Sequence, residues 1–128
     1  MLCPKCKKEM IVIERDEVEL DYCMSCEGFW FDCGEWSILC KKLIAQGFFD
    51  KLSGIYNIPV VLTGEKPRRC PVFSQAMEKF AIYDVILDRC PNKHGIWFDK
   101  NEFSACVNAS HVKTQSKQIE FLGEVFNR

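Results

Sequence analysis

Short apolar runs separated by charged turns make up most of this 128-residue chain. Residues 9–14 and 18–22 flank the turn-like sequence at residues 15–17, and this arrangement predicts a β-hairpin. Residues 28–31 then predict a third short strand. The beginning of the chain therefore favours a small antiparallel sheet.

A helix is expected directly after the third strand. Asp32 can cap it, and Glu35, three residues later, can reach back in the manner of a capping box. The helix is expected to end before Gly47. One helical face would carry Trp36, Leu39, Cys40 and Leu43.

The same pattern occurs twice. Shifting the chain by 67 residues aligns positions 3–37 with a second segment without a gap and gives 13 identities, where average composition would give about two. In the second copy Asp99 and Glu102 take the capping positions. The buried helix face there would carry Phe103, Cys106 and Val107.

These features predict a small, metal-stabilised α+β fold of two units plus a C-terminal helix, each unit being a three-stranded antiparallel sheet followed by a helix. The expected organisation is a first unit at 1–47, a connector at 48–69, a second unit at 70–109 and a tail at 110–128. The tail helix is expected from the helical spacing of Ile119, Leu122, Val125 and Phe126.

Composition excludes two classes of protein. With 17 basic and 18 acidic residues the net charge is −1, and 48% of residues are hydrophobic, so neither a disordered tail nor a strongly basic nucleic-acid coat is indicated. Residues 1–36 carry a net charge of −5, whereas residues 37–69 carry +4. The first unit is acidic and the connector is basic.

The N-terminal sequence has no secretory signal pattern, and the apolar stretches are too short to span a membrane. We therefore expect a cytoplasmic protein without membrane contact. Nine cysteines in a reducing compartment argue for metal ligation rather than disulfides.

Four cysteines of the first unit form a candidate metal site. They lie in two Cys-x2-Cys knuckles separated by the length of one hairpin, and four converging thiolates suit a closed tetrahedral zinc site. A unit of this size buries too little apolar surface to fold alone, so zinc binding and folding would be one event. Iron for electron transfer remains an alternative at the same ligands, which are Cys3, Cys6, Cys23 and Cys26.

The first unit resembles the transcription-factor-IIB-type zinc-ribbon family. The resemblance rests on the two knuckles, Met10, Asp21 and the sequence Gly28-x-Trp30-Phe31-Asp32-x-Gly34-Glu35, and it recurs in the second unit. It implies a zinc-ribbon fold with those four cysteines as ligands, and it implies little about activity.

The second unit lacks two of the four thiolates. Phe73 stands in the place of Cys6 and Lys93 in that of Cys26, whereas Cys70 and Cys90 are kept. Relatives of similar sequence use Cys-x3-His in the second knuckle, which makes His94 a candidate third ligand.

Three outcomes compete there. The favoured one is a metal-free vestigial ribbon in which Phe73 is buried in the volume of the lost site. The second is a zinc held by Cys70, Cys90, His94 and a further donor such as His111 or Cys106. The third is an open three-ligand site or a disulfide between Cys70 and Cys90.

The aromatic pairs Trp30-Phe31 and Trp97-Phe98 have two interpretations. Because adjacent strand residues face opposite sides of a sheet, at least one member of each pair should be core. The other member could stack on bases at the surface.

We expect a non-enzymatic zinc-ribbon protein that acts as an interaction module in a transcription-related or nucleic-acid-associated assembly. The balanced charge makes a protein partner the better prediction, with weak nucleic-acid contact through the basic cluster Lys66, Arg68 and Arg69. No small-molecule substrate is evident. The alternatives are a metalloenzyme with an open zinc at Cys70, Cys90 and His94, and an iron-binding electron-transfer protein.

Overall fold

The computed structural model describes residues 1–15, 17–45 and 50–110. The first unit folds as strands β1 (Ile11–Arg15), β2 (Val18–Tyr22) and β3 (Phe29–Asp32), followed by helix α1 (Cys33–Ala45). β1 and β2 pair in antiparallel register, with Ile11 opposite Tyr22. The hairpin and the third strand predicted for this unit are confirmed.

The second unit repeats this order. It consists of β4 (Glu78–Ile82), β5 (Val85–Arg89), β6 (Gly95–Phe98) and helix α2 (Glu102–Ser110). Tyr83 and Asp84 join β4 to β5 with φ angles of 50° and 64°, which is the pairing of positive angles that a tight hairpin turn requires. The internal repeat is therefore structural as well as sequential.

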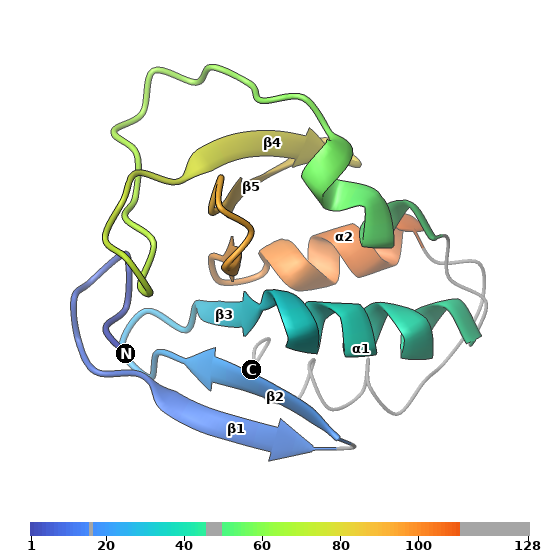
Figure 1. Ribbon diagram of the computed structural model, residues 1–128, viewed down its shortest axis with the longest axis horizontal. Coiled ribbons are helices and arrows are strands. Elements are labelled where there is room, and N and C mark those ends of the chain that lie inside the picture. The colour runs from blue at the N-terminus through green and yellow to red at the C-terminus, as the bar shows by residue number, and fades with distance from the viewer. Residues whose placement is uncertain (16, 46–49, 111–128) are drawn as a thin grey trace.

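The two units share one sheet. β3 pairs with β6, and the strands form a single six-stranded antiparallel sheet in the order β1-β2-β3-β6-β5-β4. In Figure 1 the β1–β2 hairpin and the β4–β5 hairpin lie at opposite ends of the molecule, with both helices between them. The second unit therefore docks onto the first by β-pairing.

One face of the sheet carries the main hydrophobic core. Phe29 and Phe31 of β3 are fully buried there; Phe29 stacks on Phe98 of β6, and Phe31 meets the same ring edge to face. Trp36 of α1 and Phe103 of α2 close the same aromatic cluster from above. The helix face predicted for α1 is confirmed, because all four of its apolar residues are buried.

The opposite face holds a second buried cluster. It contains Trp30 and Trp97, which lie opposite each other in the β3–β6 register, together with Met10 and Met77. Both members of each Trp-Phe pair are thus buried, one on each face of the sheet. The prediction that one of them forms a base-stacking platform at the surface is wrong, since all four side chains are fully buried.

The segment between the units contains a short 3-10 helix, η1 (Asp50–Asn57). Ile55 is fully buried in the main core, and its carbonyl oxygen accepts a hydrogen bond from the buried Arg89 guanidinium. Further along, the Val61 N–H donates to the carbonyl oxygen of Lys79 on β4 (2.9 Å). These contacts hold the connector along the second unit.

The capping predictions differ between the units. The Asp99 N–H donates to Glu102 Oε1 at 2.8 Å, so the reciprocal contact of a capping box is present in the second unit. In the first unit the prediction for Glu35 is wrong, because its carboxylate accepts the Glu19 N–H of β2 (2.9 Å) instead. α1 begins directly after β3, which places Glu35 beside β2.

The structure does not test the predicted C-terminal helix or the predicted domain boundaries. The predicted C-terminal helix lies outside the described residues, and the domain boundaries at 47, 69 and 109 stay predictions. In the part of the chain that the structure describes, none of the helices combines the length and apolarity needed to cross a bilayer.

Candidate functional site

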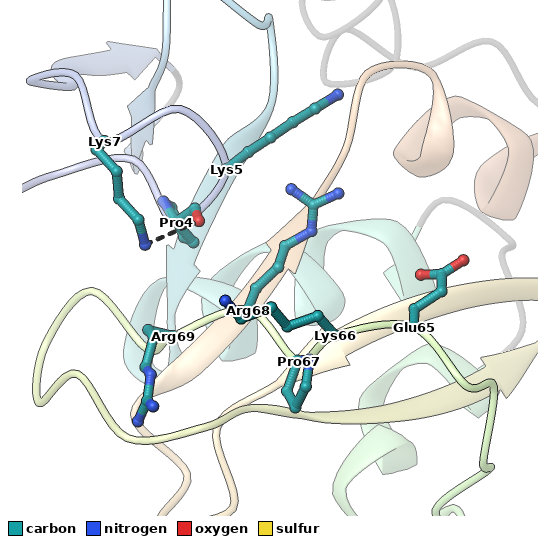
Figure 2. A pocket seen from close by; sticks show the side chains of 8 residues that line it. All are labelled: Pro4, Lys5, Lys7, Glu65, Lys66, Pro67, Arg68 and Arg69. Atoms are coloured by element: carbon teal, nitrogen blue, oxygen red, sulfur yellow. Dashed lines mark hydrogen bonds between the residues drawn. The ribbon is translucent and has the colours of Figure 1, made fainter.

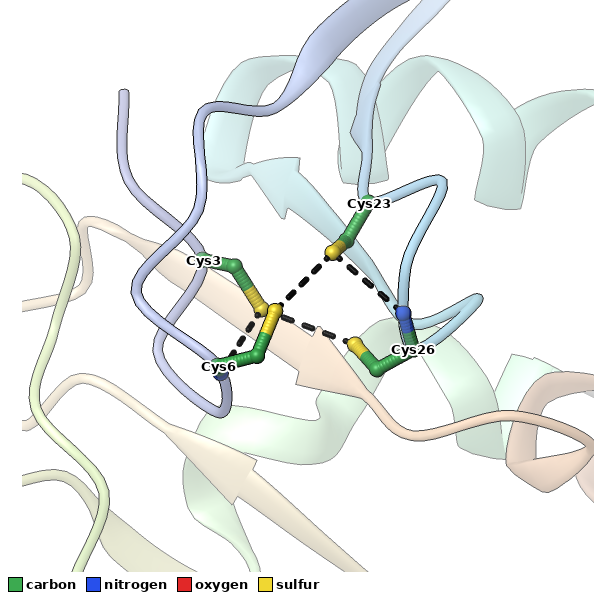
Figure 3. Close-up of side chains that lie close together, drawn as sticks. All are labelled: Cys3, Cys6, Cys23 and Cys26. Atoms are coloured by element: carbon green, nitrogen blue, oxygen red, sulfur yellow. Dashed lines mark hydrogen bonds between the residues drawn. The ribbon is translucent and has the colours of Figure 1, made fainter.

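Four sulfur atoms of the first unit point toward one another, as Figure 3 shows. The Sγ atoms of Cys3 and Cys26 are 3.6 Å apart and those of Cys6 and Cys23 are 3.3 Å apart. All four lie within 4.8 Å of one another. The first knuckle precedes β1 and the second joins β2 to β3, so the hairpin brings the two pairs together.

Backbone amides are aimed at these sulfurs. The N–H groups of Lys5 and Cys6 donate to the Cys3 sulfur at 3.3 and 3.4 Å, and the Cys26 N–H donates to Cys23 at 3.5 Å. Such donors favour the thiolate, which is the form that binds metal. Burial raises the pKa of Cys3, whereas a hydrogen bond from the Lys8 backbone lowers that of Cys6 to about 7.

The donor set fits zinc. Four thiols at these separations, two of them fully buried, match the closed tetrahedral arrangement of a structural zinc site. Zinc would be held by Cys3, Cys6, Cys23 and Cys26, and with four protein ligands no position is left for a substrate. A zinc ion bound there would cross-link the two knuckles.

Three donors of the second unit also converge. His94 Nδ1 lies 3.2 Å from the Cys90 sulfur and 3.7 Å from that of Cys70. All three donor atoms are within 4.8 Å of one another, and both thiols are free rather than joined in a disulfide. The prediction that Cys106 could be a fourth donor is wrong, because Cys106 is buried in the core on the other face of the sheet. His111, the other suggested donor, lies outside the described residues.

Phe73 corrects an expectation. Its side chain is 70% exposed, so it does not fill the volume of the lost ligand. Its ring instead lies beside His94, with the ring centroids 5.0 Å apart and the planes inclined by 37°. The sequence revealed an apolar side chain but not the side of the knuckle on which it lies.

A basic hollow of about 420 Å³ lies between the first knuckle and the connector. Figure 2 shows the side chains of both segments around it. Pro4, Pro67 and Glu65 line it together with five cations, namely Lys5, Lys7, Lys66, Arg68 and Arg69. The structure thus brings the predicted cluster at residues 66–69 together with two lysines of the zinc knuckle.

Sequence reasoning missed the contribution of Lys5 and Lys7. The signal was present in the basic residues that surround Cys6, but the net charge of −5 for residues 1–36 concealed it. Some of the cations are engaged within the protein. The Arg68 guanidinium lies 3.3 Å from Asp99, and Lys7 Nζ donates to the Pro4 carbonyl oxygen.

Charged pairs between β4 and β5 were also not predicted. Lys79 Nζ lies 2.7 Å from Asp88 and 3.5 Å from Glu65, and Arg89 Nε donates to Glu78 at 2.8 Å. Through Glu65, the Lys79 pair ties the rim of the hollow to the second unit. The hollow is therefore attached to both units.

Two ribbon-like units, one of them with four clustered cysteines, define the class of tandem zinc-ribbon proteins. The sequence profile described as transcription factor zinc-finger, a zinc ribbon of the transcription-factor-IIB type, matches residues 2–42 and 69–109. These two copies cover more than half of the chain, and the chain belongs to this family. Comparison with curated proteins and with solved structures gives no match.

Proposed function

We propose that this protein is a non-enzymatic, transcription-related interaction module that binds an acidic segment of a protein partner in the basic hollow. The observation that carries the proposal is that two segments far apart in the sequence bring five cationic residues to the lining of one hollow. One of those segments is a zinc knuckle, so its lysines are presented by a backbone that the metal would hold rigid.

A non-catalytic role is supported by the ligand set of the first unit. Four cysteines saturate a tetrahedral zinc, and a zinc without an open position cannot activate a water or a substrate. The family to which the chain belongs is named for a zinc ribbon of a transcription factor, which favours a role in assembling other macromolecules.

A protein partner is favoured over nucleic acid by charge. Tight DNA binding depends on neutralising many phosphates, whereas this chain has a net charge of −1. The hollow itself contains Glu65, and Asp99 pairs with Arg68 at its edge. A short acidic peptide segment needs fewer cations than a phosphate backbone does.

The test compares two probes of equal formal charge, a fluorescent glutamate-rich peptide and a single-stranded oligonucleotide, by anisotropy at physiological salt. We expect tighter binding of the peptide, and weaker binding by several fold in Lys5→Gln and Lys66→Gln. Lys41→Gln removes the same charge from α1, outside the hollow, and serves as the matched control. Tighter binding of the oligonucleotide than of the peptide would contradict the proposal and favour a nucleic-acid function. Peptide affinity that is unchanged in Lys5→Gln and Lys66→Gln would show that the peptide does not bind in the hollow.

A further inference from the structure

We propose that Cys70, Cys90 and His94 form a second zinc site with three protein ligands, and that its fourth position takes an imidazole or thiolate donor from outside the chain. The proposal does not depend on what binds in the basic hollow. It begins from the positions of the donor atoms, whose separations of 3.2 and 3.7 Å from His94 Nδ1 resemble the spacing of the sulfurs in the first unit.

The knuckle that carries Cys70 has kept its backbone shape. Its turn is closed by a hydrogen bond from the Ser74 N–H to the Cys70 carbonyl oxygen (2.7 Å), with Ser74 at a φ angle of 60°. The first knuckle has the same bond from Lys7 to Cys3 (2.9 Å), with Lys7 at 64°. A ligand was lost from the turn, but the conformation that aims the remaining sulfur was not.

The second knuckle has been rebuilt to supply a different donor. In the first unit the left-handed residue is Glu27, four positions after Cys23, and its N–H closes the turn. In the second unit the left-handed residue is Lys93, three positions after Cys90. Both turns then return to the same bond, from the knuckle cysteine N–H to a glycine carbonyl oxygen (3.0 and 3.1 Å). The tighter turn places His94 where its imidazole reaches the two sulfurs.

Within residues 1–15, 17–45 and 50–110, the fourth position of this site is open. Among the described residues, no further cysteine, histidine or carboxylate belongs to this donor group. Phe73, which replaces the missing ligand, is 70% exposed and lies against the His94 ring instead of occupying the site. Three protein ligands with a free position are the arrangement in which zinc binds an exogenous donor.

The chemistry of the three ligands defines the incoming donor. Two thiolates and one neutral imidazole leave zinc without net charge, and binding releases the two thiol protons. A fourth nitrogen or sulfur donor would complete the tetrahedron that zinc prefers. A histidine or cysteine side chain of a partner protein, or a small thiol, has this chemistry.

The first measurement is the metal content of the full chain by elemental analysis. We expect two zinc ions per chain in the wild type and one in Cys90→Ser. A wild-type protein with one zinc, unchanged in number by Cys90→Ser, would overturn the proposal. Because this count is made on the wild type, it holds even if the variant folds poorly.

The second measurement follows the absorption bands of the cobalt-substituted protein during addition of imidazole or of a monothiol. We expect a change in the bands that belong to the second site, with the first site unaffected, and the two titrations distinguish a nitrogen from a sulfur donor. Phe73→Cys supplies a fourth thiolate and should abolish the response, whereas Phe73→Ala should preserve it. Two bound ions without any response in the wild type would show that the fourth position is closed and would also overturn the proposal.

Discussion

Gly28 lies against the indole ring of Trp97, so closely that a methyl group in place of its hydrogen would lie 2.8 Å from Cη2 of that ring. The same relationship holds in the other direction, because a methyl group at Gly95 would lie 2.5 Å from Cζ2 of Trp30. Each unit therefore uses its glycine to accommodate the tryptophan of the other. The Gly-x-Trp sequence that recurs in both copies therefore forms the contact between the two units.

Gly28→Ala should destabilise the joint between the units. The added methyl group cannot be accommodated without moving a fully buried indole, and overpacking of this kind costs about 1–3 kcal/mol. The measurement is chemical denaturation at constant free zinc. Gly34→Ala is the matched control, because Gly34 lies in α1 with open space around it and alanine there should stabilise by up to about 1 kcal/mol. Equal effects of the two changes would contradict the close contact.

Much of the fold could be predicted because local spacing determines it. The hairpins, the buried face of α1 and the grouping of Cys3, Cys6, Cys23 and Cys26 all depend on residues within one unit. The single sheet could not be predicted, since the pairing of Trp30 with Trp97 joins positions 67 residues apart that alternation alone does not connect.

The candidate site was predicted only in part for a similar reason. Lys5 lines the hollow because the connector runs beside the first knuckle. No pattern within the first unit predicts the path of the connector. Phe73 was expected to be buried at the second metal site because it is apolar. It lies in a tight turn that ends at Ser74, and this turn leaves the ring exposed to solvent.

Removal of one ligand of the first site should unfold the first unit. Cys6→Ser or Cys26→Ser leaves three thiolates, and a unit this small depends on the metal for its stability. Elemental analysis measures the loss of zinc, and thermal unfolding measures the loss of stability. Cys33→Ser changes an exposed cysteine outside the metal group and should leave both readouts unchanged. A cooperatively melting first unit in the metal-free variant would argue against a structural role for zinc.

Phe73→Ala should have almost no effect on the free energy of unfolding. A side chain that is 70% exposed contributes little to burial, and surface substitutions are usually within about 0.5 kcal/mol. Phe103→Ala, by contrast, empties a position in the aromatic core and should cost about 3–5 kcal/mol. Denaturant titration of the two variants side by side decides the point, and a large loss for Phe73→Ala would mean that its ring is buried after all.

Any nucleic-acid contact should be weak, salt-sensitive and dependent on Lys66, Arg68 and Arg69. Affinity that comes from phosphate neutralisation falls linearly with the logarithm of salt concentration. Replacing these three residues with glutamine should reduce that slope by about 1 for each cation that contacts a phosphate. The salt dependence of oligonucleotide anisotropy measures it; tight binding that persists at moderate salt is the contrary result.

Glu102 should make stability depend on pH. Burial raises the pKa of its carboxyl from 4.5 to about 7 in the folded protein. The folded state therefore holds this proton more tightly than the unfolded chain does, and the stability it contributes is lost as pH rises from about 4.5 to about 7. Glu102→Gln keeps the oxygen that accepts the Asp99 N–H and should remove this loss. Melting temperatures of both proteins across that range, at the same zinc concentration, provide the comparison; parallel profiles would count against the assignment.

The register of the central strands has a further consequence. β3 and β6 pair so that Trp30 meets Trp97, its own counterpart in the repeat, while Phe29 meets Phe98 and Phe31 meets Ile96. The two copies are thus related by an approximate two-fold axis that passes between the tryptophans, and each presents the same surface to the other, as in an isologous interface. Two copies of one ribbon could therefore pair through this same register. Covalent linkage of two such ribbons in one chain removes the requirement that the copies be identical, and the two ligand sets are among the positions at which they differ.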